Sequence, residues 1–82
     1  MITHVAIIID DVIFALPKPN RHQNIFLYLY ERDVIVTKIP EQGFLDENNK
    51  FLTRTEARDY AIECGQITKS NHESKLNSND LW

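Results

Sequence analysis

The sequence predicts a small α+β domain, in which an antiparallel sheet of two β-hairpins plus one further strand packs with two helices. Three observations predict this class: two apolar runs joined by a pair of aspartates, a helix-like pattern that begins after Asn20, and a second hairpin that leads straight into a capped helix. We assign residues 1–67 to a single α+β domain and residues 68–82 to an irregular but ordered C-terminal tail.

The first element is an antiparallel hairpin formed by the apolar runs 3–9 and 12–16, with Asp10 and Asp11 as its turn. Both runs are rich in residues that favour strands, and neither alternates strictly between apolar and polar positions. We therefore expect either that both faces of this hairpin are covered or that one face meets another chain.

The first helix is predicted over 21–32, because Asn20 is a favoured N-cap and Asp33 ends the pattern. The segment is apolar nearly all round its axis, through Ile25, Phe26, Leu27, Tyr28, Leu29 and Tyr30. Such a helix is either deeply buried or shared with a partner, so we expect a homo-oligomer.

A third strand is predicted over 34–39, followed by the second hairpin. Asn48 and Asn49 are suited to the left-handed positions of a two-residue turn. That turn places Leu45 opposite Leu52.

The second helix begins with a capping box, in which the hydroxyl of Thr53 accepts the amide of Glu56 and the carboxylate of Glu56 accepts the amide of Thr53. It ends at Gly65, the usual left-handed cap. Cys64 shares the small-residue side of this helix, so we expect a buried core thiol.

The last residues, Leu81 and Trp82, are apolar although the tail before them is polar. We expect both side chains to dock, on their own core or on a neighbouring protomer, in preference to a fraying end.

The net charge, the cysteine count and the length of the apolar runs restrict the possible functions. The net charge of −3 argues against binding to extended nucleic acid, and a single cysteine excludes an internal disulfide and fits a reducing compartment. The apolar N-terminal run is less than half the roughly 20 residues of a membrane span and lacks a basic flank. We therefore expect neither a signal peptide nor a membrane partner.

The first candidate site is the start of the first helix, where Lys18, Asn20, Arg21 and His22 lie beside free amides. Arg21 can bind phosphate with its two-pronged guanidinium, and His22 can donate to the same anion or act as a base. In the alternative interpretation Asn20 only caps, Arg21 is solvated and His22 packs on Phe26.

The second candidate site is the start of the second helix, where Arg54 and Arg58 are one turn apart. They can provide another anion contact, or they can belong to a solvated face. If both helix starts converge, Arg21 and Arg54 would form one phosphate site.

Catalytic and metal-binding arrangements find little support. The three histidines, His4, His22 and His72, have no metal-ligand spacing. Asp10 and Asp11 are suited to a turn, and two glycines are too few for a phosphate loop of the Walker type. We expect no catalytic residue, no metal and no cofactor.

Taken together, a set of residues resembles a family of short, largely uncharacterised proteins of tailed phages and prophages. The resemblance rests on Asn20-Arg21-His22, Gln42-Gly43-Phe44-Leu45, Phe51, Arg54, Glu56-Ala57, Ala61, Gly65-Gln66 and Asp80-Leu81-Trp82. It implies a protein made in the cytoplasm of an infected bacterium. Small phage proteins of this kind often oppose host defence, some by sequestering nucleotide immune signals.

The leading hypothesis is a counter-defence binding protein that sequesters a phosphate-bearing small molecule such as a nucleotide immune signal. Arg21 and Arg54 would hold the phosphate, and Asn20 and His22 would orient it. The alternative is a protein-interaction inhibitor of a host defence or metabolic enzyme, which would make its contact through the acidic C-terminal half and the Leu81-Trp82 end. A third hypothesis, an enzyme on nucleotides with His22 as acid or base, ranks last because the sequence offers His22 no partner.

Overall fold

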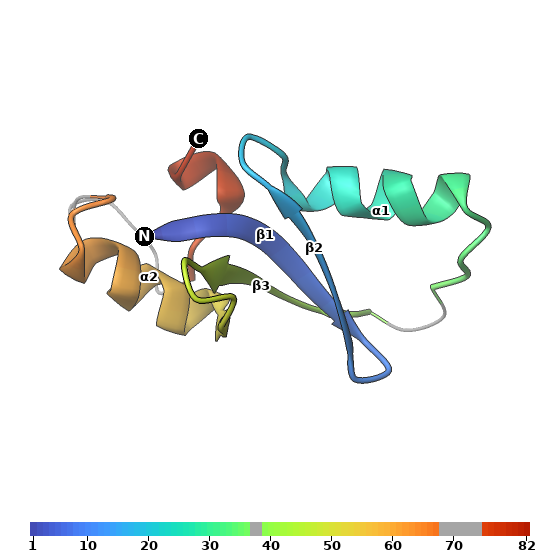
Figure 1. The fold of residues 1–82 in the computed structure, drawn as a ribbon, viewed down its shortest axis with the longest axis horizontal. Helices are drawn as coiled ribbons and strands as arrows, with labels where there is room; N and C mark the ends of the chain where they lie inside the picture. Colours follow the sequence, from blue (N-terminus) through green and yellow to red (C-terminus); the bar gives the residue numbers. More distant parts are fainter. Residues whose placement is uncertain (37–38, 68–74) are drawn as a thin grey trace.

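The computed structural model describes residues 1–36, 39–67 and 75–82, and there it contains a four-stranded antiparallel sheet with two helices (Figure 1). The predicted α+β class is confirmed. The elements in chain order are β1 (Ile2–Ile9), β2 (Val12–Pro17), α1 (His22–Glu31), β3 (Glu41–Asp46), β4 (Phe51–Thr53), α2 (Arg54–Glu63) and a 3-10 turn at Ser78–Asp80.

The strands lie in the order β2-β1-β3-β4, so β2 and β4 form the edges of the sheet. The predicted N-terminal hairpin is confirmed: Ile9 pairs with Val12, and Asp10 and Asp11 have φ values of 49° and 64°. Two left-handed residues make a turn whose twist matches that of the strands, and Asp tolerates this backbone region.

The strand predicted over 34–39 is wrong in its described residues, because Val34–Val36 and Ile39 are irregular, whereas residues 37 and 38 lie outside the described part. β3 begins instead at Glu41. Residues 34–36 pair with none of the four strands, and Val34 and Ile35 are 39% and 82% exposed. The β-branched run therefore forms an exposed connection.

The predicted register of the second hairpin is wrong by one residue. Phe44 lies opposite Leu52, and Leu45 lies opposite Phe51. This register puts Phe44 and Leu52 on the same face of the sheet, where both are buried. On the other face the Phe51 ring lies so close to Gly43 that a Cβ there would be 2.4 Å from the ring.

The turn of this hairpin explains the different register. Only Asn49 has a positive φ, 63°, and the loop has three residues because the amide of Asp46 donates to the carbonyl of Lys50. One carboxylate oxygen of Asp46 also accepts the amides of Asn48 and Lys50, at 2.8 and 2.9 Å. The Asp side chain therefore stabilises the longer loop, an interaction that a count of turn residues overlooks.

The capping box of α2 is confirmed. The Thr53 hydroxyl accepts the Glu56 amide at 3.2 Å, and the Glu56 carboxylate accepts the Thr53 amide at 3.0 Å. The helix ends as predicted before Gly65, which has a φ of 78°. Cys64, however, is exposed at the C-cap, so the expected buried thiol is wrong. The chain leaves the sheet at this point, and the small-residue side of the helix is buried only up to Ala61.

The N-cap of α1 is Arg21, one residue later than predicted. Its amide donates to the side-chain oxygen of Asn24 at 2.8 Å. Asn20 does not cap the helix; its side-chain amide donates to the carbonyl of Pro17, earlier in the chain. At the other end Asp33 has a φ of 57° and terminates the helix as expected.

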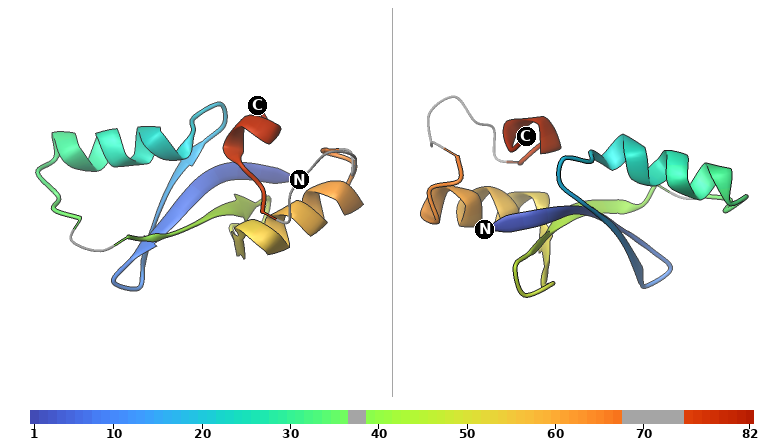
Figure 2. Two further views of the ribbon diagram at one scale, coloured as in Figure 1. Left: turned by 180° about the vertical axis from the view of Figure 1, so that it is seen from behind. Right: turned by 45° about the horizontal axis from the view of Figure 1, so that its top comes forward.

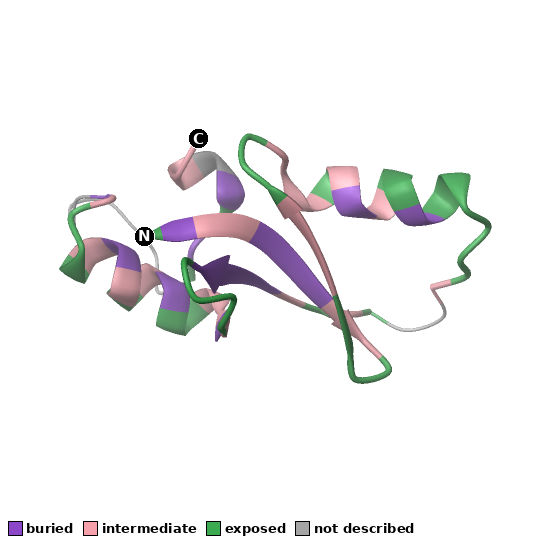
Figure 3. Cartoon of the chain, in the orientation of Figure 1, coloured by how far each residue is buried: buried purple, intermediate pink, exposed green. Residues whose placement is uncertain are grey.

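The strand residues of the core lie on one face of the sheet. Figure 3 shows which residues of the chain are buried. Both helices contribute to it, and its buried members are Ile2, Val5, Ile7, Ile25, Leu29, Phe44, Leu52, Ala57, Ala61, Ile67 and Leu76. α1 packs on β1 and β2, whereas α2 packs on β3 and β4. The helices run outward from the middle of the molecule in opposite directions, and the C-terminal segment lies between their starts (Figures 1 and 2).

Candidate functional site

The starts of the two helices meet the C-terminal segment, residues 76–82. Buried Leu76 anchors this segment in the core, and Leu81 and Trp82 pack against the core from its edge. Each helix supplies one arginine that donates to the segment. The structure therefore brings the two sequence-predicted arginines to one short stretch of chain.

The start of α1 holds the end of that stretch. The Arg21 guanidinium donates to the main-chain oxygen of Trp82 at 2.6 Å. In return the indole nitrogen of Trp82 donates to the carbonyl of Asn20 at 2.7 Å. Arg21 and Asn20, both predicted to bind a ligand, here bind the tail of their own chain.

The start of α2 holds the other end of the stretch. The Arg54 Nε donates to the carbonyl of Leu76 at 2.9 Å, and its terminal nitrogen donates to the side-chain oxygen of Asn77. The amide of Leu76 also donates to the Arg54 carbonyl at 3.0 Å. Arg54 thus links α2 to the tail through both main chain and side chain.

His22 connects α1 to the sheet. Its Nε2 donates to the Gly43 carbonyl at 2.8 Å, and its ring packs edge-on against Phe44, with centroids 5.0 Å apart. In the alternative interpretation His22 packed on Phe26, and in the structure its ring meets Phe44. Burial is the main cause that lowers the pKa of His22; the Gly43 hydrogen bond opposes it, and the positive charge of Arg54 adds to it. His22 is therefore a neutral donor at pH 7.

The two remaining predicted cations do not join this arrangement. Lys18 is exposed, and its amide donates to the Thr3 carbonyl at the end of the first hairpin. Arg58 pairs with Asp59 on α2 at 3.0 Å, and its Nε is buried without a hydrogen-bond partner among the described residues. The six predicted residues thus divide into three that are bonded to the tail (Asn20, Arg21 and Arg54), His22 on the sheet, and two separate positions.

A polar hollow of about 320 Å³ opens beside the start of α2. Arg54 and Lys75 provide its positive charge, Thr53 and Thr55 contribute hydroxyl groups, and Glu41 adds a negative charge. Among the described residues, Arg21 is not part of this lining. The hollow can accept a small anion, and Lys75 is a member that the sequence did not single out because it lies in an irregular polar stretch.

A second feature is apolar, and the sequence indicated only its helical part, through the all-round apolar character of the first helix. The outer side of α1 and the connection after it form a surface, which we call the α1 surface, made of Phe26, Leu27, Tyr30, Val34, Ile35 and Val36. Tyr30 is 80% exposed, Ile35 82% and Leu27 56%. Its groove measures about 630 Å³. The signal in the sequence was the β-branched run 34–36, which was assigned to a strand.

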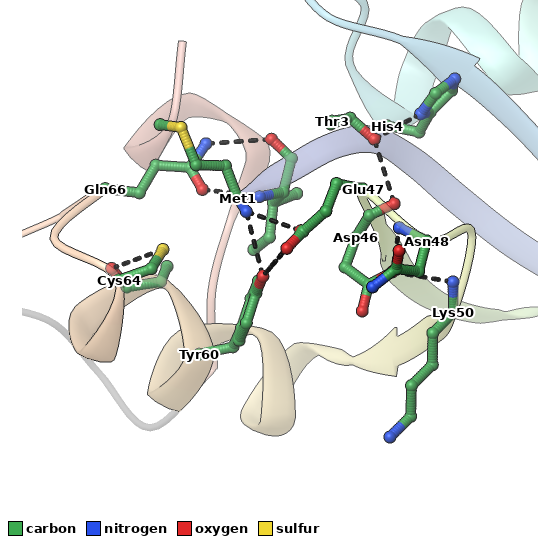
Figure 4. A network of polar contacts seen from close by, with 12 residues as sticks. Met1, Thr3, His4, Asp46, Glu47, Asn48, Lys50, Tyr60, Cys64 and Gln66 are labelled. Carbon is green, nitrogen blue, oxygen red and sulfur yellow. Dashed lines mark hydrogen bonds and ion pairs between the residues drawn. The ribbon is translucent and has the colours of Figure 1, made fainter.

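A separate polar network joins the chain start to α2 and the second hairpin (Figure 4). The Met1 amino group donates to Glu47 at 2.6 Å, and the Tyr60 hydroxyl donates to the same carboxylate at 2.7 Å. These two hydrogen bonds lower the pKa of Glu47 to about 2, and the bond to Glu47 raises the pKa of Tyr60 to about 12. Every group in this network is occupied by another, which favours a structural role.

Within the described residues, no group of His, Cys, Asp and Glu side chains is arranged to hold a metal ion. Both helices have ten residues, and in the described part of the chain none has the length and apolar character needed to cross a bilayer.

Fold and site together define a small α+β protein with one helix-covered sheet face, a tail clamped by two arginines and an exposed apolar surface. The chain belongs to the phage T4 y16D protein family, whose model matches residues 1–82. No curated protein and no solved structure gives a significant match. The predicted membership of a phage protein family is confirmed.

Proposed function

We propose that this phage protein is a counter-defence binding protein that acts in the host cytoplasm by blocking a bacterial defence or metabolic enzyme through protein contact. The observation that carries the proposal is the α1 surface. Large apolar side chains there are exposed although the core of so small a domain would gain from burying them. Contiguous exposed apolar surface is typical of a protein-binding site.

This function was the alternative in the sequence interpretation, which placed the contact at the acidic C-terminal half and Leu81-Trp82. The geometry favours a different contact. Leu81 and Trp82 pack on their own core, and the indole nitrogen of Trp82 is hydrogen-bonded within the chain. Leu27, Tyr30 and Ile35 are the large apolar groups that a partner can cover.

The test is capture of a bacterial enzyme by the purified protein, followed by assay of that enzyme. Leu27→Asp places a charge in the centre of the α1 surface, whereas Thr55→Asp places the same charge at an exposed position of α2. We expect wild type and Thr55→Asp to capture and inhibit the enzyme and Leu27→Asp to do neither. Inhibition that survives Leu27→Asp, or the lack of any inhibited enzyme, contradicts the proposal.

A second candidate function is capture of a phosphate-bearing small molecule, which the hollow beside Arg54 and Lys75 favours. Its size and its mixture of cations and hydroxyl groups suit a phosphate group. Because Arg21 and Arg54 already donate to residues 76–82, a ligand that used both would have to displace the tail.

Calorimetric titration with cyclic nucleotides, cyclic dinucleotides and ADP-ribose tests this second function. Lys75→Ala should weaken binding of the active compound, whereas Lys50→Ala, which removes an exposed lysine from the second hairpin, should not. If none of these compounds binds, or if both variants bind equally well, the small-molecule function is wrong.

A further inference from the structure

The edge strand β2 leaves main-chain groups unpaired. The Lys18 amide donates to the Thr3 carbonyl, and in an antiparallel ladder every second residue faces the same neighbour. Val12, Phe14 and Leu16 therefore direct their main-chain groups toward β1. Ile13, Ala15 and Pro17 direct theirs to the open edge, where the sheet ends in the described residues.

Of these three residues, Pro17 is not available for further pairing. It has no amide hydrogen, and its carbonyl already accepts the main-chain and side-chain amides of Asn20, at 3.1 and 2.8 Å. The open edge thus offers four groups, the amides and carbonyls of Ile13 and Ala15.

The edge is also open in space. A groove of about 280 Å³ runs beside it, lined by Ile13, Phe14, Ala15, Leu16, Ile25 and Tyr28. β2 carries no charged residue, and Val12 and Ile13 are 52% and 47% exposed. Edge strands normally have a charge, a proline or a bulge that prevents pairing. β2 has no charge and no bulge, and its proline is its last residue, so residues 12–16 are left unprotected. The other edge, β4, has three residues and leads directly into α2.

We propose that β2 pairs antiparallel with β2 of a second copy of this chain and forms a continuous eight-stranded sheet. In the register that uses all four free groups, Ile13 lies opposite Ala15 of the other copy and Phe14 lies opposite Phe14. The two helix-covered faces are then on the same side. This pairing uses the main-chain groups of β2 and none of the residues of the α1 surface.

Charge favours a second copy over an unrelated strand. In this register the turn of one copy, with Asp10 and Asp11, lies near Lys18 of the other copy, and two-fold symmetry produces this contact twice. Between them, residues 12–17 are uncharged, so self-pairing brings no like charges together. The edge is therefore complementary to itself in hydrogen bonds, apolar contact and charge.

The first test is sedimentation equilibrium of the purified chain over a range of concentrations. We expect a species of twice the mass of one chain, abolished by Ile13→Lys. Lys18→Glu should weaken dimerisation about ten-fold, since two exposed ion pairs become repulsive. Adding Asp10→Asn should recover part of that loss. Lys50→Glu makes the same charge change away from the edge and should have no effect.

The second test fixes the register. In a Cys64→Ser background, single cysteines at positions 13, 14 and 15 are compared for disulfide-linked dimer formation. Residues opposite each other in a non-hydrogen-bonded pair have Cα atoms about 4.5 Å apart, which suits a disulfide. We expect Phe14→Cys to cross-link fastest.

Three results overturn the proposal: a monomer at all concentrations, a dimer unchanged by Ile13→Lys, or cross-linking that is no faster at position 14. Circular dichroism melting of each variant shows whether it is folded, and the exposed substitution Lys18→Glu decides the outcome if Ile13→Lys proves unstable.

Discussion

Replacing His22 should reveal how strongly α1 is fixed to the sheet. His22→Ala removes the hydrogen bond to the Gly43 carbonyl, worth about 1 kcal/mol, and the edge-on contact with Phe44, worth about 0.5–1.5 kcal/mol. We expect a loss of about 2 kcal/mol from a free energy of unfolding of roughly 4–12 kcal/mol for a domain of this length. The melting temperature should fall by about 8–16 °C.

The same side chain should make stability depend on pH. Because burial lowers the pKa of His22 below its ordinary value of 6.5, the unfolded chain takes up a proton before the folded chain does. Stability is therefore fully present above pH 6.5 and declines as the pH falls from 6.5 toward the folded pKa. His22→Gln can keep a donor for the Gly43 carbonyl but cannot titrate, so its stability should change less in this range.

Urea unfolding at pH 7, 6 and 5 measures both effects. His4→Gln is the matched control, because it makes the same substitution at a histidine of β1 whose ring contacts the Thr3 hydroxyl and not the Gly43 carbonyl. Carboxylates that titrate at lower pH affect all three proteins alike, so the difference between wild type and His22→Gln isolates His22. If wild type and His22→Gln lose stability in parallel from pH 7 to 5, the assignment of His22 as a buried neutral donor is refuted.

Three further perturbations follow from local geometry. Thr53→Ala should cost about 1 kcal/mol in urea unfolding, because the Glu56 amide loses its cap; no change would remove the capping box as a stabilising feature. Gly43→Ala should cost about 1–3 kcal/mol or more in the same assay, since the new Cβ would lie 2.3 Å from the Leu52 carbonyl oxygen; a neutral result would contradict the close approach. Glu47 has a pKa lowered from 4.5 to about 2, so its contribution is present above pH 4.5 and lost as the pH falls toward 2; acid unfolding of Glu47→Gln should lack this component.

Local signals predicted much of this fold. The aspartate pair at 10–11, the capping box at Thr53 and the helix end at Gly65 each depend on residues close together in the sequence. Their physical cause is local backbone chemistry, so one sequence is sufficient to locate them. The α+β class followed from their order along the chain.

The predictions were wrong where tertiary contacts determine the structure of a segment. Residues 34–36 have the composition of a strand, but they pair with none of the four strands. The register of the second hairpin was set by the Asp46 carboxylate, which favours a three-residue loop. Cys64 lies on the small-residue side of α2 yet beyond the point where the helix leaves the sheet. Each outcome depends on which other segment is nearby, and residue spacing does not contain that information.

The candidate site was likewise predicted only in the part that depends on local sequence. Sequence reasoning identified cations at two helix starts, and the structure brings Arg21 and Arg54 to one segment. It did not identify the occupant, because nothing local indicates that Leu76 and Trp82 present their carbonyl oxygens there. Lys18 and Arg58, selected by the same spacing argument, lie elsewhere.

The arginine contacts also determine how binding experiments must be interpreted. α1 and α2 pack on opposite halves of the sheet, and the segment 76–82 is bonded to the start of each. Removal of either guanidinium leaves a half-buried carbonyl oxygen without its donor, so Arg21→Ala and Arg54→Ala should destabilise the domain whether or not a ligand exists. Loss of binding in these variants is therefore weak evidence for a phosphate site. Lys75, Leu27 and Lys18 can be changed without breaking a contact that holds the fold together, and they separate the hypotheses of anion capture, protein inhibition and self-pairing from one another.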